Sequence, residues 1–190
     1  MGMKDDFYAR GEFSSNQRNY GIYRRGEPYI DPQSGELLGI RAIDVGSAKI
    51  KALEDDIATL GVSRAQGEIR IKDRLLISEE RTLASTFYPR APEVPVKAQV
   101  LNVEDGVRSA GPLDVVAINR GQRDGLQAGD TLAISKRGDI TRDRVANQQV
   151  QLPDERIGLL MVFYTYEKMS FGLVMEADRQ VDVGDMLSNP

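Results

Sequence analysis

Two residue types that carry much of protein chemistry are missing from this chain, which contains no cysteine and no histidine in 190 residues. Disulfides, thiol nucleophiles, Cys/His zinc sites and Ser-His catalytic pairs are therefore excluded. Carboxylates, hydroxyls, lysine and arginine remain. We expect a protein that is not an enzyme, with no catalytic residue, no bound metal and no cofactor.

Long apolar runs and an excess of positive charge are missing too. The longest apolar stretches, such as Ile157 to Tyr166, are much shorter than the roughly 20 residues that span a bilayer, so no membrane span is expected. The net charge is −4, from 25 basic and 29 acidic residues, which argues against a small-barrel nucleic-acid binder. Met1-Gly2-Met3, followed almost at once by a strand-like segment, indicates a chain that begins inside a larger protein.

Short β-favouring segments separated by Gly, Asp, Asn and Pro recur along the chain and predict an all-β fold. Alternation of apolar and polar residues is clearest from Val96 to Val100. A hairpin is expected from Tyr20 to Gly39, with its turn at residues 32–35. The other predicted strands are Phe7–Arg10, Ile40–Val45, Val96–Val103, Leu113–Ile118, Thr131–Ile134, Leu159–Tyr166 and Phe171–Met175.

Comparison of the chain with itself indicates an internal duplication. The matching pairs, in order, are 8–11 with 118–121, 22–27 with 134–139, Asp31 with Asp143, 36–39 with 155–158, Val62 with Val174, and 69–75 with 181–187. The duplication aligns the ambiguous segment 58–62 with 170–174, so we predict a strand from Ile57 to Val62 rather than a helix. The expected product is a pair of related small antiparallel β-barrel or sandwich units.

The predicted organisation is a first β unit at residues 1–86, a proline-rich linker at residues 87–95, and a second β unit at residues 96–190. Three prolines in the linker remove backbone donors and favour extended geometry. The first unit is expected to lack a strand at its start, because the second is preceded by Val96–Val103 and the first only by residues 1–6.

The closing segment of each predicted unit ends in an Asp-containing pattern that also occurs at residues 126–132. Gly supplies a positive φ, and Asp is expected to accept a hydrogen bond from its own backbone two residues on. Turn chemistry is the preferred interpretation of Asp73, Asp130 and Asp185, and metal ligation or acid catalysis is the alternative.

Few other residues suggest chemistry. Glu54-Asp55-Asp56 and Glu79-Glu80 lack the spacing of a calcium loop and are interpreted as solvated charge. Ser170 with Lys168 is a formal Ser-Lys candidate without a histidine. A binding hypothesis is an aromatic and basic patch that stacks on sugar or base rings, and the alternative is that these side chains cover the edge of a core. Its residues are Tyr20, Tyr23, Arg24, Arg25 and Tyr29.

Several stretches resemble the C-terminal region of LysM-domain-containing, peptidoglycan-binding proteins of Gram-negative bacteria. They are residues 7–11, 22–24, 31–32, 35–36, 115–126, 152–156, Gly158, 160–163 and 183–185. In such proteins a signal peptide and a LysM module come first, and the LysM module contacts the glycan. The resemblance implies a periplasmic, cell-envelope location and peptidoglycan binding through an upstream module. It transfers no site residue to this chain.

Two functions follow as hypotheses. The first is a non-enzymatic accessory or scaffold region of a periplasmic, peptidoglycan-associated protein that acts through protein–protein contacts, including self-association into a homo-oligomer at exposed strand edges. The alternative is a carbohydrate-binding module that contacts cell-wall glycan directly.

Overall fold

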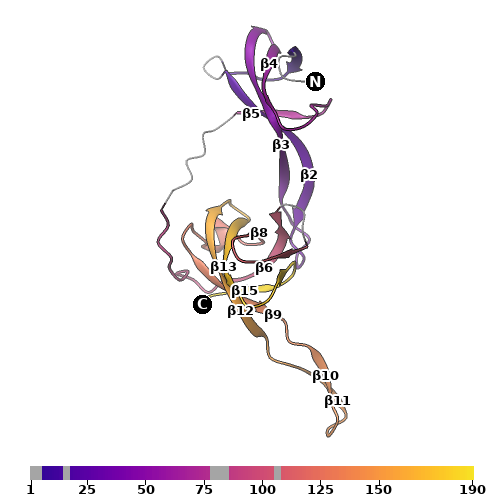
Figure 1. Ribbon diagram of the computed structural model, residues 1–190, viewed down its shortest axis with the longest axis vertical. Helices are drawn as coiled ribbons and strands as arrows, with labels where there is room; N and C mark the ends of the chain where they lie inside the picture. Colours follow the sequence, from indigo (N-terminus) through magenta and orange to yellow (C-terminus); the bar gives the residue numbers. More distant parts are fainter. Residues whose placement is uncertain (1–5, 15–17, 78–85, 105–107) are drawn as a thin grey trace. The chain divides into compact units, whose positions relative to one another are not determined.

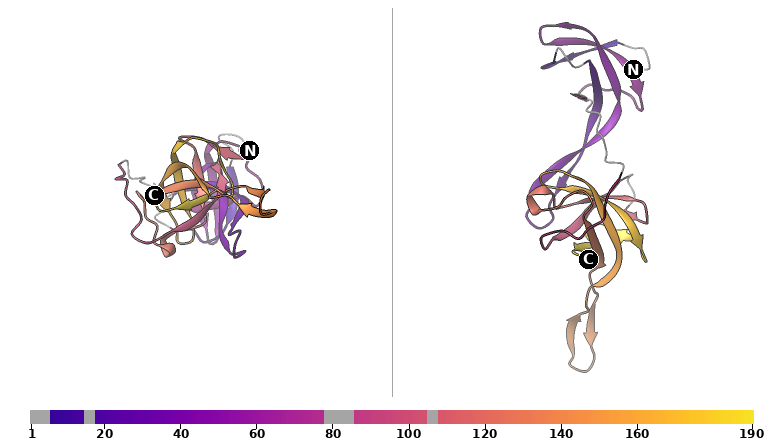
Figure 2. Two further views of the ribbon diagram at one scale, coloured as in Figure 1. Left: turned by 90° about the horizontal axis from the view of Figure 1, so that it is seen from below. Right: turned by 90° about the vertical axis from the view of Figure 1, so that its left-hand side faces the viewer.

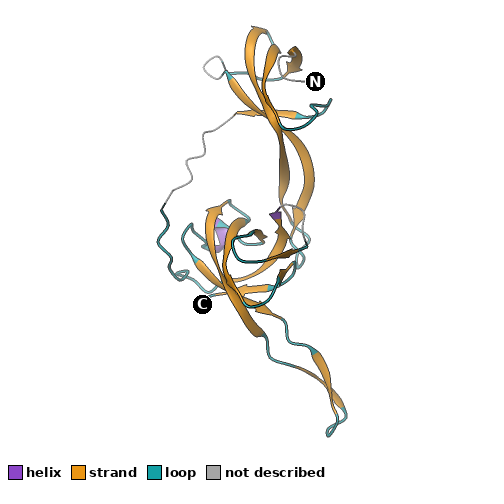
Figure 3. Cartoon of the chain, viewed as in Figure 1, coloured by secondary structure: helices purple, strands orange, loops and turns teal. Residues whose placement is uncertain are grey.

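The computed structural model describes residues 6–14, 18–77, 86–104 and 108–190, and these residues are nearly all in strands and the loops that join them (Figure 3). The chain divides into two compact units (Figure 1). Unit 1 holds residues 1–28 and 40–83, and unit 2 holds residues 29–39 and 84–190. The sequence predicted an all-β chain, which is confirmed. Residues 29–39, assigned to the first unit from the sequence, group with unit 2.

Unit 1 contains a five-stranded sheet with the order β1-β4-β3-β2-β5. Its strands are β1 (Asp6–Arg10), β2 (Asn19–Ile30), β3 (Leu37–Glu54), β4 (Ile57–Ala65) and β5 (Arg74–Ile77). The predicted strand at residues 57–62 is therefore confirmed. Burial alternates along β4 because Ala58, Leu60 and Val62 face the core. Tyr20 and Ile22 of β2 belong to the same core.

Unit 2 is built around a closed six-stranded barrel in which every neighbouring pair is antiparallel. Large apolar side chains that are almost fully buried fill its interior, among them Ile118, Leu132, Ile134 and Leu160. The barrel order is β12 (Glu155–Thr165), β13 (Ser170–Ala177), β8 (Val115–Ile118), β6 (Lys97–Val103), β15 (Met186–Ser188) and β9 (Thr131–Lys136).

The remaining elements of unit 2 lie outside the barrel sheet. β7 (Ser109–Ala110) pairs with β14 (Val181–Asp182), and η2 (Gln122–Asp124) is a single 3-10 turn. β10 (Ile140–Asp143) pairs with β11 (Gln148–Gln151). In the part of the chain that the structure describes, no helix is long and apolar enough to cross a membrane.

The two units share a strand order. Along the chain, β1 to β5 of unit 1 correspond to β8, β9, β12, β13 and β15 of unit 2, and both sets have the same neighbours in the same sequence. In unit 2 the additional strand β6 lies between β8 and β15 and closes the barrel. In unit 1 the corresponding strands β1 and β5 are the two ends of the sheet. The structure therefore shows that the two units have a common strand topology, and the duplication of the sequence stays a prediction.

Four Asp turns have one geometry, and their aspartates are Asp73, Asp114, Asp130 and Asp185. In each turn, Oδ2 of the aspartate accepts a hydrogen bond of 2.8 Å from the backbone N–H three residues earlier. The residue just before each aspartate has a positive φ, between 73° and 97°. The predicted turn role is confirmed for the three aspartates singled out above, but the side chain bonds to a residue earlier in the chain, not to one two positions later.

The proline-rich segment is fastened to the barrel of unit 2. Arg90 N–H donates to the carbonyl of Gly129 at 3.0 Å, and Thr131 N–H donates to the carbonyl of Arg90 at 2.8 Å. Val96 N–H donates to Oδ1 of Asn189 at 2.7 Å, and Pro92 is buried. Because these backbone groups are paired within unit 2, residues 88–96 lie bound along the barrel of that unit, whereas the sequence suggested a linker.

Candidate functional site

The five residues of the predicted glycan patch are not assembled in one place. Tyr20 is 4% exposed and belongs to the core of unit 1, where its ring meets Phe13 edge to face. Tyr29 is 8% exposed in unit 2, and its hydroxyl donates to Oε1 of Glu104 at 2.8 Å. Neither ring offers an open face, so stacking of a sugar on these two tyrosines does not fit this structure.

The other three patch residues are partly or fully accessible. The Tyr23 ring lies over Gly21, since a Cβ added there would be 2.4 Å from Cε2 of that ring. Arg24 donates from Nε and Nη2 to both oxygens of Asp73, at 2.9 and 2.8 Å, and these bonds hold the pKa of that carboxyl below its ordinary value. Arg25 is exposed. A basic surface remains at these positions, with Arg24 committed to a structural ion pair.

The nucleophile and metal candidates have structural roles. Ser170 is fully buried, and its hydroxyl donates to the carbonyl of Arg120 at 2.7 Å, while Lys168 pairs with Glu36 at 2.7 Å, so the two do not act as a Ser-Lys pair. Glu54, Asp55 and Asp56 are exposed around the β3–β4 turn. Glu79-Glu80 lies outside the described residues. Among the residues that are described, no group of three or more acidic side chains is placed to hold a metal ion.

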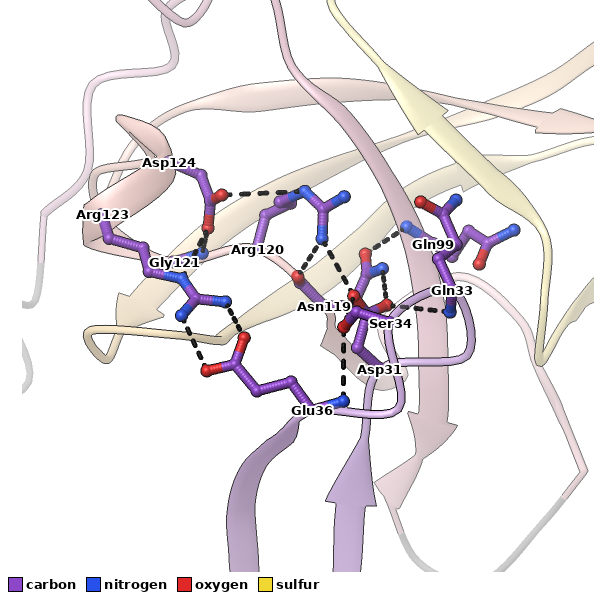
Figure 4. Close-up of polar contacts among 10 residues, drawn as sticks. All are labelled: Asp31, Gln33, Ser34, Glu36, Gln99, Asn119, Arg120, Gly121, Arg123 and Asp124. Carbon is purple, nitrogen blue, oxygen red and sulfur yellow. Dashed lines mark hydrogen bonds and ion pairs between the residues drawn. The ribbon is translucent and has the colours of Figure 1, made fainter.

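A cluster of polar side chains in unit 2 holds the tip, which we define as residues Tyr29–Gly39 at the end of the β2–β3 hairpin (Figure 4). Asp31 is 5% exposed and accepts hydrogen bonds from Nδ2 of Asn119 at 2.9 Å, from the Ser34 hydroxyl at 2.8 Å and from the Gln33 N–H at 3.4 Å. Burial raises the pKa of Asp31, but these hydrogen bonds and the nearby Arg120 outweigh it and leave the pKa below its ordinary value.

The same cluster extends to the surface through Glu36. Arg123 donates to both of its carboxylate oxygens at 2.9 and 2.7 Å, and Lys168 lies 2.7 Å from Oε1. Hydrogen bonds first from Arg123 and then from Lys168 lower the pKa of Glu36 to about 2. The two carboxylates that hold the tip, Asp31 and Glu36, are both paired with side chains of unit 2, so we assign this cluster the role of attaching the tip to the barrel.

A groove of about 460 Å³ in unit 1 is the better candidate site. It is lined by both end strands of the sheet, β1 and β5, by the segment after β1, and by the start of β2. Its wall is largely apolar, through Phe7, Phe13, Tyr20, Ile22, Ile69 and Leu75. These residues come from segments far apart in the sequence, and the order of the sheet brings them to one opening.

Polar features mark this groove as well. The Tyr20 hydroxyl is buried and has no hydrogen-bond partner in the described part of the chain. Four basic residues line the groove against two acidic ones, Glu12 and Asp73. Asp73 is paired with Arg24, and two of the basic residues are paired as well, Arg10 with Asp56 and Arg70 with Glu68. The basic residues are Arg10, Arg70, Lys72 and Arg74. The site combines an apolar wall, a cationic rim, two strand edges and one unpaired buried donor.

Sequence reasoning missed this groove, although it singled out Tyr20 and the short start of the first unit. Comparison with models of known protein families gives no match for the chain, and comparison with curated proteins gives no match either. The geometry of the site therefore carries the functional argument.

Proposed function

We propose that this chain is a non-enzymatic accessory or scaffold protein that acts through protein–protein contacts, and that the groove of unit 1 captures an extended protein segment as an added β-strand. One observation carries the proposal. In unit 2, β6 pairs with β8 on one side and with β15 on the other, whereas the corresponding strands β1 and β5 are the ends of an open sheet that line one groove.

Two strand edges that have no partner strand among the described residues supply the binding energy and fix the direction of the captured segment. Backbone N–H and C=O groups on an edge strand are a template for a further strand, and alternate side chains of that strand enter the pockets behind it. In β6 the inward side chains are Ala98, Val100 and Val103, each about 1% exposed. The captured segment therefore has small or β-branched apolar residues on one face.

Charge and hydrogen bonding further restrict which protein segments the groove can bind. Lys72 and Arg74, the basic lining residues besides the ion-paired Arg10 and Arg70, favour a segment that carries carboxylates on its outer face or at its ends. A backbone carbonyl or polar side chain of the segment would accept from the Tyr20 hydroxyl, which relieves an unpaired buried donor that costs about 1–3 kcal/mol.

A peptide with the sequence of residues 96–104 tests this function. Added to the whole protein, it is expected to bind saturably by fluorescence anisotropy and to protect amides of β1 and β5 together from hydrogen exchange. Ile71→Asp, at a fully exposed apolar residue of the groove lining, should weaken binding at least about tenfold.

Val145→Asp is the matched control, because Val145 and Ile71 are both 97% exposed and Val145 lies outside the groove. This control should bind the peptide like the unmodified protein. No binding at millimolar peptide, or protection of neither edge, would refute strand capture.

The setting of this function is also a proposal. The resemblance to LysM-domain-containing proteins supports a periplasmic, peptidoglycan-associated role, with glycan contacts made by an upstream module. Direct glycan binding is the second candidate, and it is favoured by Tyr8, which lines the groove with 78% of its surface exposed. Retention of this chain on purified peptidoglycan, and loss of retention in Tyr8→Ser, would favour the glycan reading over strand capture.

A further inference from the structure

Two hairpins of this chain end in the same type of loop, the tip and the arm, which we define as residues 137–154 around β10 and β11. In both, a four-residue loop follows an aspartate, Asp31 or Asp143, and ends in a left-handed residue, Gly35 (φ 73°) or Asn147 (φ 54°). In both, Oδ1 of the aspartate accepts the backbone N–H two residues on. The tip belongs to the hairpin β2–β3, and the arm extends its topological counterpart β9–β12.

The surroundings of the two hairpins differ. The tip buries Tyr29 and Leu38 against Ala117 and Met169 of unit 2 and fastens itself through Asp31. The arm buries nothing: every residue of β10 and β11 is exposed except the half-buried Asp143. A two-stranded hairpin with no packed face has little stability alone. Docking of the arm would also cover its exposed apolar residues Ile140, Val145 and Val150.

Unit 1 carries an outer face that corresponds to the surface under the tip. In unit 2 this surface begins with Ala117, the outward residue of β8 between the core residues Val116 and Ile118. In unit 1 the outward residue of β1 is Tyr8, between Phe7 and Ala9, which pack on the core. Tyr8 is 78% exposed.

The turn beside this face also has a counterpart in unit 2. Met169 precedes the buried Ser170 at the start of β13, and Ile57 precedes the buried Ala58 at the start of β4. Ile57 is 47% exposed, so the face of unit 1 presents Tyr8 and Ile57 uncovered.

Charges on the arm and on this face are complementary. The end of the arm carries Arg142 and Arg144 around Asp143. The β3–β4 turn beside Ile57 carries the exposed Asp55 and Asp56, and Asp56 is paired with Arg10 of β1 at 2.5 Å. Between the tip and its surface the signs are reversed, because there the hairpin supplies the acid, Glu36, and the turn before β13 supplies Lys168. The end of the tip is thus opposite in charge to the turn that it contacts, and the end of the arm is opposite in charge to the β3–β4 turn of unit 1.

We propose that the arm of one copy docks on the outer face of β1 and β4 in a second copy, next to the Asp55-Asp56 turn. This contact joins two different surfaces, so repetition gives a closed ring or an open head-to-tail chain. This contact shares Tyr8 with the lining of the groove, whereas the residues that its test changes, on the arm and at the Asp55-Asp56 turn, lie outside the groove.

Sedimentation velocity over a concentration series tests the contact in the whole protein. The unmodified protein should form larger species as concentration rises, and less so at high salt. Arg142→Asp combined with Arg144→Asp should weaken association at least about tenfold, and so should Asp55→Lys combined with Asp56→Lys. An equimolar mixture of these two double variants should associate again, because the charges at the contact are then exchanged.

Lys97→Asp combined with Arg156→Asp is the control, since it makes the same change in net charge at exposed positions on β6 and β12. It should associate like the unmodified protein. Circular dichroism reports whether each variant is folded. A protein that stays monomeric at millimolar concentration, or folded double variants whose mixture does not associate, would overturn the proposal.

Discussion

The guanidinium group of Arg123 donates to both carboxylate oxygens of Glu36, at 2.9 and 2.7 Å, and joins the tip to the 3-10 turn η2 of unit 2. A bidentate pair of this kind fixes direction as well as distance. Together with the buried bond between Asn119 and Asp31, it explains why a hairpin that begins in unit 1 ends as part of unit 2.

The first prediction concerns Glu36 and pH. Its pKa is about 2 in the folded protein and near 4.5 in the unfolded chain, so the folded state holds the charged form more strongly. The stabilisation is complete above about pH 4.5 and is lost as the pH falls toward 2. The melting temperature of Glu36→Gln should be lower than that of the unmodified protein at pH 7, and calorimetry should find that the difference shrinks between pH 4.5 and 2. A constant difference over that range would contradict this account.

The second prediction concerns the buried amide of Asn119. Its Nδ2 donates to Asp31, and its Oδ1 accepts the N–H of Gln99 at 2.6 Å. Asn119→Ala removes the acceptor of the Gln99 N–H and one of the three hydrogen bonds to the buried Asp31, so urea unfolding should show a loss of about 2–4 kcal/mol. Gln148→Ala, at an exposed amide on the arm, should stay within about 0.5 kcal/mol of the unmodified protein.

The third prediction uses the Asp turns. Leu113 is 74% exposed and has φ 73°, a conformation in which a side chain is strained. Leu113→Gly should therefore stabilise the protein by about 0.5–1 kcal/mol, after the added freedom of the unfolded chain is subtracted. Gly129→Ala should do the reverse, because Gly129 has φ 97° and a Cβ there would lie 2.9 Å from the Tyr88 carbonyl oxygen. Thermal unfolding of the two variants in opposite directions is the expected result.

The fourth prediction concerns two glycines at which strands approach closely. A Cβ on Gly158 would lie 2.2 Å from the carbonyl oxygen of Glu176, and one on Gly46 would lie 2.2 Å from that of Arg64. Gly158→Ala and Gly46→Ala should each cost about 2–3 kcal/mol. Gly11→Ala is the control, since nothing lies within 4 Å of its added Cβ. Equal stability of all three variants would show that the strands shift without cost.

Sequence patterns predicted the buried strands well and the exposed ones poorly. Thr131–Ile134 and Phe171–Met175 have a core face, and their predicted ranges fall inside β9 and β13. The arm has no such face, so alternation gave no signal for β10 and β11. The short strands β5 and β15 were read as parts of a turn pattern, because strands of three or four residues carry too little periodicity.

Register was beyond the reach of sequence comparison. The sequence aligned Gly39 with Gly158, but in the strand pairing the residue that corresponds to Gly158 is Gly46. Gly46 pairs with Ala65 and Gly158 pairs with Ala177, and each pair lies just before a register shift. The candidate groove was equally invisible, since it depends on β1 and β5 lying at the two ends of one sheet. Tyr20 was singled out for an exposed ring, and the structure buries that ring in the wall of the groove.

Lys136 and Glu155 face each other across β9 and β12, so the chain leaves the barrel for the arm and returns to it at one paired position. The arm can therefore be replaced by another segment without moving the two strands from which it extends. A short turn grafted between these two residues would give a protein that can receive an arm but cannot donate one in the proposed contact. The same position accepts a fluorophore or an affinity tag without a change in the register of the barrel strands.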